Sequence, residues 1–183
     1  EIGLPNLLST DIGPVIDQDA KDRINNHVKS FSSKVLAQSS LEINHQGYYV
    51  APVIIEIEDL DEVKEEIFGP VIHVYRFQSN TIEKLISDIN NMNYGLTLGV
   101  QSRIENTINY IFNNASVGNI YINRNIVGAV VGVHPFGGRG LSGTGPKAGG
   151  PNYLLKFANE KSYSYDTTAA GGNATLFMMS ENQ

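Results

Sequence analysis

Segments with strand periodicity and segments with helix periodicity alternate through the middle of the sequence, and this order restricts the fold more than any other feature. Continuous apolar runs at 71–77, 96–102 and 119–124 predict three strands. Between them, apolar residues recur every three or four positions and predict two helices, the first beginning near Asn80 or Thr81. Strand–helix–strand order with short connections is typical of parallel βαβ units whose sheet is covered on both faces. The sequence therefore predicts an α/β fold with a parallel sheet.

The two ends of the chain are less regular. An apolar stripe over 15–37 predicts a helix with Pro14 in its first turn, and a β-branched run at 48–57 predicts a strand. Near the C-terminus, the alternating residues at 161–172 suggest another strand. Because that strand would present an unpaired edge, we expect it to join another sheet or another subunit, as an oligomerisation strand. We accordingly divide the chain into a domain at 1–157 and a tail at 158–183.

Charge and cysteine content exclude several classes of function. The chain has 13 basic and 19 acidic residues and a net charge of -6, without a basic stripe, so nucleic acid is not an expected partner. It has no apolar run of the roughly 20 residues that cross a bilayer, and no signal-peptide pattern. The absence of cysteine excludes disulfides and a thiol nucleophile, and agrees with a cytoplasmic location. We predict no metal site, because four histidines lack metal-ligand spacing: His27, His45, His73 and His134.

A glycine-rich run, "HPFGGRGLSGTGPKAGGPNYLLKF" at 134–157, interrupts the regular pattern and holds seven glycines between Phe136 and Pro151. Residues 138–143 spell G-x-G-x-x-G, but the prolines and glycines that follow forbid the helix that a dinucleotide fingerprint requires. The P-loop and nucleophile-elbow patterns also fail. Two interpretations stay open. The backbone N–H groups bind an anion, with Lys147 as reinforcement, or the glycines form a tight connection that needs positive φ angles.

A second candidate is the acidic cluster that precedes the predicted bend Phe68-Gly69-Pro70. Such a cluster is usually a solvated turn, and that interpretation stays open here. The alternative is that the bend turns Glu66 into a cleft. The cluster consists of Asp59, Asp61, Glu62, Glu65 and Glu66.

Two motifs, in this order and separation, resemble the NAD(P)-dependent aldehyde dehydrogenase superfamily. They are "EEIFGPV" at 65–71 and "PFGGRGLSGTG" at 135–145, and they are similar to the C-terminal half of its catalytic domain. The longer string at 118–154 resembles the branch that oxidises L-glutamate γ-semialdehyde, the open form of pyrroline-5-carboxylate. The tail "TTAAGGNATL" at 167–176 resembles the segment after this domain in bifunctional enzymes that also carry a flavin-dependent proline dehydrogenase.

The resemblance implies roles for particular residues. Glu66 would accept hydrogen bonds from the hydroxyls of the nicotinamide ribose of NAD, and Phe68 would lie beside the nicotinamide. Gly149 and Gly150 would offer backbone N–H groups to the α-carboxylate of the semialdehyde, and Phe136 would pack near the mouth of the site. The resemblance also implies a homo-oligomer, and FAD in the associated proline dehydrogenase.

The same resemblance shows what these 183 residues lack. In the family a cysteine thiolate attacks the aldehyde, and the cofactor domain lies N-terminal to that cysteine. We therefore expect the chain to be the C-terminal part of a longer enzyme, to contribute no catalytic residue and to be inactive alone. Two alternatives are a stand-alone carboxylate-binding or assembly module, and a family member that acts on another aldehyde. The "KAGGP" loop argues against the latter, because a carboxylate anchor serves only a substrate that has a carboxylate.

Overall fold

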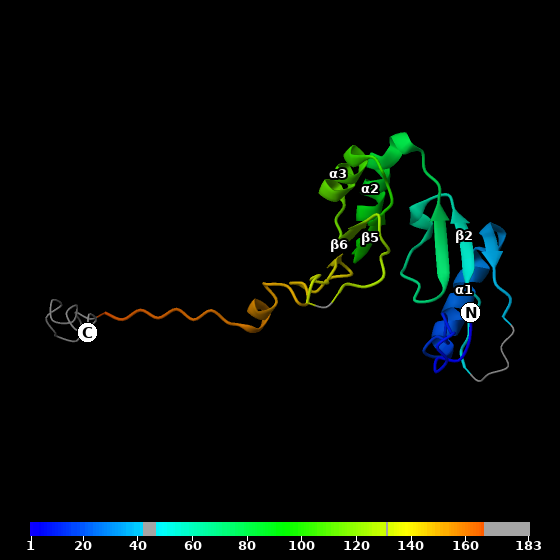
Figure 1. Cartoon of the computed structure of the whole chain (residues 1–183), viewed down its shortest axis with the longest axis horizontal. Helices are drawn as coiled ribbons and strands as arrows, with labels where there is room; N and C mark the ends of the chain where they lie inside the picture. The colour runs from blue at the N-terminus through cyan, green and yellow to red at the C-terminus, as the bar shows by residue number, and fades with distance from the viewer. Residues whose placement is uncertain (42–46, 131, 167–183) are drawn as a thin grey trace. The chain divides into compact units, whose positions relative to one another are not determined.

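The computed structural model describes residues 1–41, 47–130 and 132–166. The chain forms two compact units. The first comprises Glu1–Ile126 together with Gly138–Gly143, and the second comprises Val127–Gly137 together with Thr144–Gln183. All the α-helices and β-strands of the described residues lie in the first unit (Figure 1).

The first helix, α1, spans Gln18–Ser30 and is shorter than the sequence predicts. It begins after Asp17, whose carboxylate accepts a hydrogen bond from the Ala20 N–H at 2.8 Å, so the prediction that Pro14 lies in its first turn is wrong. The prediction that the helix continues to residue 37 is also wrong. A short 3-10 turn follows α1, and the β-branched Val35 then starts strand β1, Val35–Gln38.

Strands β1, β2 (Val53–Ile57) and β3 (Val71–Tyr75) form a three-stranded sheet in that order. Strand β1 pairs antiparallel with β2, and β2 pairs parallel with β3. Alternate residues of β2 are buried, and α1 covers that face of the sheet with Val28 and Phe31 (Figure 1). The predicted strand at 48–57 is confirmed in its second half. It begins after Pro52, which has no N–H to donate to a ladder.

The predicted alternation in the middle of the sequence is confirmed. Helix α2 (Ile82–Asn91) is followed by β5 (Thr97–Val100), α3 (Glu105–Asn114) and β6 (Asn119–Ile122). Strands β5 and β6 pair parallel, and the buried residues Ile86, Val100 and Ile111 form the core between the helices and this pair. The two parallel strand pairs confirm the predicted α/β class.

The described residues after β6 have little regular structure. Strand β4 (Tyr94–Gly95) pairs antiparallel with β7 (Arg139–Gly140), and a 3-10 helix spans Leu154–Phe157. Residues 158–166 form no strand in this single chain, and 167–183 lie outside the described residues. The oligomerisation strand and the domain boundary after residue 157 therefore stay predictions. No helix within the described ranges is both long and apolar enough to span a membrane.

Candidate functional site

The segment that holds Glu66 and Phe68 connects a short 3-10 helix, Leu60–Glu62, to β3. Its end is fixed by consecutive backbone hydrogen bonds, from the Gly69 N–H to the Ile67 carbonyl oxygen at 3.0 Å and from the Val71 N–H to the Gly69 carbonyl oxygen at 2.8 Å. The predicted bend is therefore present as two tight turns. They hold the backbone next to Phe68 in one conformation.

Gly69 also allows helix α1 to approach this segment closely. A Cβ atom at position 69 would lie 2.4 Å from Ile24 Cδ1 and 3.1 Å from Ile24 Cγ1. Ile24 is only 1% exposed, so its side chain has little space into which to move. A residue without a side chain is needed at this position because of the helix that packs on it.

The acidic cluster divides into carboxylates with different surroundings. Glu62 accepts hydrogen bonds from Lys34 Nζ at 2.6 Å and from the N–H of Glu58 at 2.8 Å. The hydrogen bond from Lys34, followed by that from the Glu58 backbone, lowers the pKa of Glu62 to about 2. Glu66 is exposed, and no described residue forms a hydrogen bond or an ion pair with its carboxylate. Glu62 therefore stabilises the local fold, whereas the acceptor oxygens of Glu66 are available to a ligand.

Phe68 lies two residues beyond Glu66 on the same connection, and its side chain is 77% exposed. A phenylalanine ring that reaches solvent this far contributes little to the core of the unit. An exposed aromatic ring beside an unengaged carboxylate can accept a ligand that combines a planar ring with hydroxyl groups.

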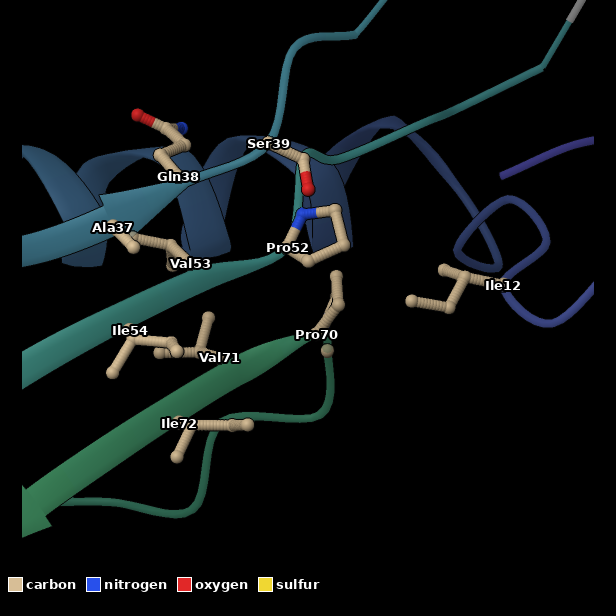
Figure 2. A pocket seen from close by; sticks show the side chains of 11 residues that line it. Ile12, Ala37, Gln38, Ser39, Pro52, Val53, Ile54, Pro70, Val71 and Ile72 are labelled. Atoms are coloured by element: carbon tan, nitrogen blue, oxygen red, sulfur yellow. The ribbon is translucent and has the colours of Figure 1, made fainter. Parts of the chain in front are cut away.

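A pocket of about 420 Å³ adjoins the Gly69 and Pro70 end of this segment. Figure 2 shows its side chains, which come from the ends of β1, β2 and β3 and from Ile12. The lining is mainly aliphatic and contains no charged side chain. Its residues are Ile12, Ala37, Gln38, Ser39, Pro52, Val53, Ile54, Gly69, Pro70, Val71 and Ile72. It offers a mainly apolar surface, in which Gln38 and Ser39 are the only polar side chains among the described lining residues.

The middle of the glycine-rich run, residues 138–143, is a close-packed connection in the first unit. The Leu141 N–H donates to the Asn93 carbonyl oxygen at 2.8 Å, beside the pairing of β4 and β7. A Cβ atom at Gly140 would lie 2.2 Å from Asn93 Oδ1, and one at Gly143 would lie 2.1 Å from the Gly138 carbonyl oxygen. For 138–143, the interpretation as a tight connection is therefore right.

The two flanks of the run, residues 134–137 and 144–157, belong to the second unit. Phe136 and Ala148 exchange two backbone hydrogen bonds, of 3.0 and 2.9 Å, which hold the half-buried Phe136 beside Gly149. Gly149 has a φ of +71°, and a Cβ atom there would have no neighbour within 4 Å. None of the described residues accepts a hydrogen bond from its N–H. The Gly150 N–H, in contrast, donates to the Lys147 carbonyl oxygen at 3.0 Å.

The two glycines of the predicted carboxylate anchor therefore differ in the availability of their N–H groups. In this conformation Gly149 can donate to an anion, whereas Gly150 must first release its turn to Lys147. Glu66 and Phe68 lie in the first unit and Phe136, Gly149 and Gly150 in the second, so each group is a candidate by itself.

Two histidines that are far apart in the sequence are in contact. His27 Nε2 on α1 lies 2.8 Å from His73 Nε2 on β3, and both side chains are half-buried. Desolvation lowers the pKa of His27, against an opposing effect of Glu65. Desolvation also lowers the pKa of His73, and the charge of His27 lowers it further. A separation of 46 positions gave no spacing signal, and only the packing of α1 on the sheet brings the two rings together.

Residues 1–163 match the aldehyde dehydrogenase family. The chain belongs to this family. Among relatives, it is 48% identical over 182 residues to the bifunctional protein PutA of Escherichia coli, covering 94% of this chain and 14% of that protein. It is 37% identical over 169 residues to the 1-pyrroline-5-carboxylate dehydrogenase of Bacillus licheniformis, covering 90% of this chain and 32% of that protein.

Solved structures of the family agree. A crystal structure of a mutant of Bradyrhizobium japonicum proline utilization A is 47% identical with a TM-score of 0.82, covering 93% of this chain and 18% of that one. A 1-pyrroline-5-carboxylate dehydrogenase from Thermus with bound NAD is 33% identical with a TM-score of 0.74, covering 85% and 30%. The chain spans only 13–14% of the length of the PutA relatives from Klebsiella aerogenes and Escherichia coli.

Proposed function

We propose that the chain is part of an NAD-dependent dehydrogenase that oxidises L-glutamate γ-semialdehyde to L-glutamate in proline catabolism. Support comes from the names of the relatives, which include bifunctional PutA proteins and 1-pyrroline-5-carboxylate dehydrogenases, one of them with bound NAD. The observation that carries the proposal is the exposure of the Glu66 carboxylate. This carboxylate is exposed, no described residue engages it, and the "EEIFGPV" segment that holds it ends in two tight turns, while nearby Glu62 is used in local hydrogen bonds.

The residues of the first unit fit a nicotinamide nucleotide. Glu66 has two acceptor oxygens that no described residue uses, and these suit the vicinal hydroxyls of a ribose. The exposed ring of Phe68 offers an apolar face to a planar base. NAD, when bound, supplies the acceptor for the hydride that the aldehyde carbon loses. The part of Glu66 and Phe68 is to hold and orient the nicotinamide ribose.

The residues of the second unit fit the aldehyde substrate, at the end that carries its α-carboxylate. The Gly149 N–H can donate to the α-carboxylate, an interaction with a charged acceptor. Phe136, held beside it by the pairing with Ala148, offers an apolar wall to the carbon chain. Selection for a substrate with a carboxylate therefore belongs to the loop that contains Gly149, and the nucleotide belongs to the segment that contains Glu66.

These 183 residues contain no cysteine, so we assign the family's thiol nucleophile to another part of a longer polypeptide. The proposal also includes a flavin-dependent proline dehydrogenase on the same polypeptide, as in the relatives called bifunctional, and a homo-oligomer. By this proposal, the chain alone binds and orients but does not catalyse.

The test compares two proteins: the polypeptide of the full reading frame that contains this chain, and the 183-residue chain alone. Both are assayed for NADH formation with glutamate semialdehyde and with propanal, which has no carboxylate. We expect activity in the longer polypeptide only, with glutamate semialdehyde the better substrate. Inactivity of both with either aldehyde contradicts a dehydrogenase and favours a binding or assembly module. Preference for propanal contradicts the assigned substrate.

A further inference from the structure

Helix α1 contacts two places just beyond the Glu66–Phe68 segment, Gly69 and strand β3. Ile24 packs against Gly69 directly, and His27 lies one helical turn further along the same face. His27 reaches His73 on β3, the strand into which the segment leads. One helix therefore contacts both the end of the candidate cofactor segment and the strand that follows it.

Three aromatic rings build the second contact. The His27 and His73 rings meet edge to face, with centroids 5.0 Å apart. The Phe31 ring lies 4.9 Å from the His27 ring and 5.9 Å from the His73 ring. Phe31 also packs against the buried residues of β2, so the ring cluster is continuous with the core of the sheet. The histidine pair is part of the packing that holds α1 in place.

We infer that His27 and His73 are positioning residues, which hold α1 against the Glu66–Phe68 segment and make nicotinamide nucleotide binding sensitive to pH. The inference rests on the proposed function, because it assigns that segment to the nucleotide. Neither histidine touches the ligand. Both act through Ile24 and Gly69.

The chemistry of the pair explains the sensitivity. A hydrogen bond between two Nε2 atoms needs an N–H on one ring and a lone pair on the other. A first added proton can bind Nδ1 of the ring that donates, and the hydrogen bond remains. A second added proton must bind the accepting Nε2 atom, and the contact then becomes a repulsion between two cations. The bond therefore exists only while one of the two rings has an unprotonated Nε2 atom.

The direction of the pH effect follows from the surroundings of the rings. The titratable groups here are His27 on α1, His73 on β3 and Glu65, which lies on the connection from the 3-10 helix Leu60–Glu62 to β3 and whose charge acts on His27. Burial lowers the pKa of both histidines below the ordinary value of 6.5. The released or unfolded pair therefore binds protons more readily than the packed pair does. The contact is at full strength above pH 6.5 and weakens as the pH falls towards the lowered pKa values.

The first experiment measures amide hydrogen exchange across 64–71 in the full-length polypeptide, as protection relative to an unstructured peptide at each pH. We expect protection of the Gly69 and Val71 amides to fall several-fold between about pH 7.5 and about pH 5.5, a range around the ordinary histidine pKa. The double variant His27→Gln/His73→Gln keeps a hydrogen-bonding amide pair that does not titrate. Its protection should not change with pH. The control His134→Gln should behave as wild type, because His134 is outside the ring cluster.

The second experiment measures the KM for NAD and the KM for glutamate semialdehyde over the same pH range. In the wild type we expect the KM for NAD to rise several-fold on acidification, and more than the KM for the aldehyde. In the double glutamine variant this rise should disappear. A single variant, His27→Gln, serves if the double variant does not fold. Its pH dependence should be weaker than that of the wild type.

The outcomes separate this inference from the proposed function. If wild-type polypeptide does not oxidise the aldehyde with NAD, the proposed function fails, and the exchange experiment still decides whether the histidines hold the segment. Protection that does not change with pH, or that changes equally in wild type and variant, overturns the positioning role. A pH-dependent protection with no change in the KM for NAD overturns the link to the nucleotide.

Discussion

Replacement of Gly149 by alanine tests whether the second half of the glycine-rich run binds the substrate carboxylate. The backbone at Gly149 has a φ of +71°, which costs an alanine roughly 1–2 kcal/mol. No atom lies within 4 Å of the added Cβ, so the substitution causes no steric clash. The peptide then either keeps its conformation under strain or rotates and takes its N–H away from the anion.

The expected effect on binding follows from the lost hydrogen bond. A hydrogen bond to a charged group contributes about 1.5–3 kcal/mol, and about 1.4 kcal/mol corresponds to a factor of 10 in affinity. We therefore expect Gly149→Ala to raise the KM for glutamate semialdehyde roughly tenfold or more in the full-length polypeptide. The KM for propanal, which has no carboxylate, should change little.

Gly132 provides a matched control for this substitution. Its φ is +80°, and a Cβ atom there would also have no neighbour within 4 Å, so Gly132→Ala carries the same backbone cost at a position outside the anchor. Steady-state NADH formation with both aldehydes gives the four KM values for each variant. Equal increases for the two aldehydes, or equal effects of the two substitutions, would refute the carboxylate anchor.

Four further substitutions test the other assignments. Glu66→Gln should raise the KM for NAD several-fold and leave esterase-type acylation of the catalytic cysteine of the full-length polypeptide nearly intact. An unchanged KM and turnover for NAD would remove Glu66 from the site. Gly69→Ala should lower the free energy of local opening of β3, measured by hydrogen exchange, by about 1–3 kcal/mol. Adding Ile24→Val, which removes Cδ1, to the Gly69→Ala variant should restore part of this free energy. If the losses of the two substitutions simply add, the contact between Ile24 and position 69 is contradicted. Gly143→Ala should lower the melting temperature far more than Gly149→Ala, because the Gly138 carbonyl oxygen cannot move as a side chain would.

The regular elements that the sequence predicted best are those with strong periodicity. Helix α2 begins after Thr81, and β5, α3 and β6 follow in the predicted order, since each buries one clear apolar face. The prediction failed where periodicity continued past a helix end. Val35 continues the apolar stripe of α1, but it pairs opposite Ile55 of β2 as part of a strand. That preference comes from a partner in the sheet, and local sequence does not contain it.

The candidate site was only partly predictable for a related reason. The carboxylates Glu62 and Glu66 look alike in sequence, and their difference depends on Lys34, which lies 28 positions before Glu62. The contact between His27 and His73 likewise depends on the packing of α1 against β3. Residue type and spacing therefore identify candidates, but long-range contacts decide which polar groups are already used.

The glycine-rich run shows why a count of glycines cannot assign a function. Gly140 and Gly143 are needed because another backbone or side chain occupies the space of a Cβ atom, and such positions serve the fold. Gly149 has open space around it and an N–H that no described residue uses, so the fold alone does not explain its N–H. Gly150 lies between these cases, because its N–H is engaged by Lys147. The two interpretations of the run are therefore not exclusive. Residues 138–143 are a structural connection, and Gly149 contributes one feature that anion sites use, a backbone donor without a partner in the chain's described part.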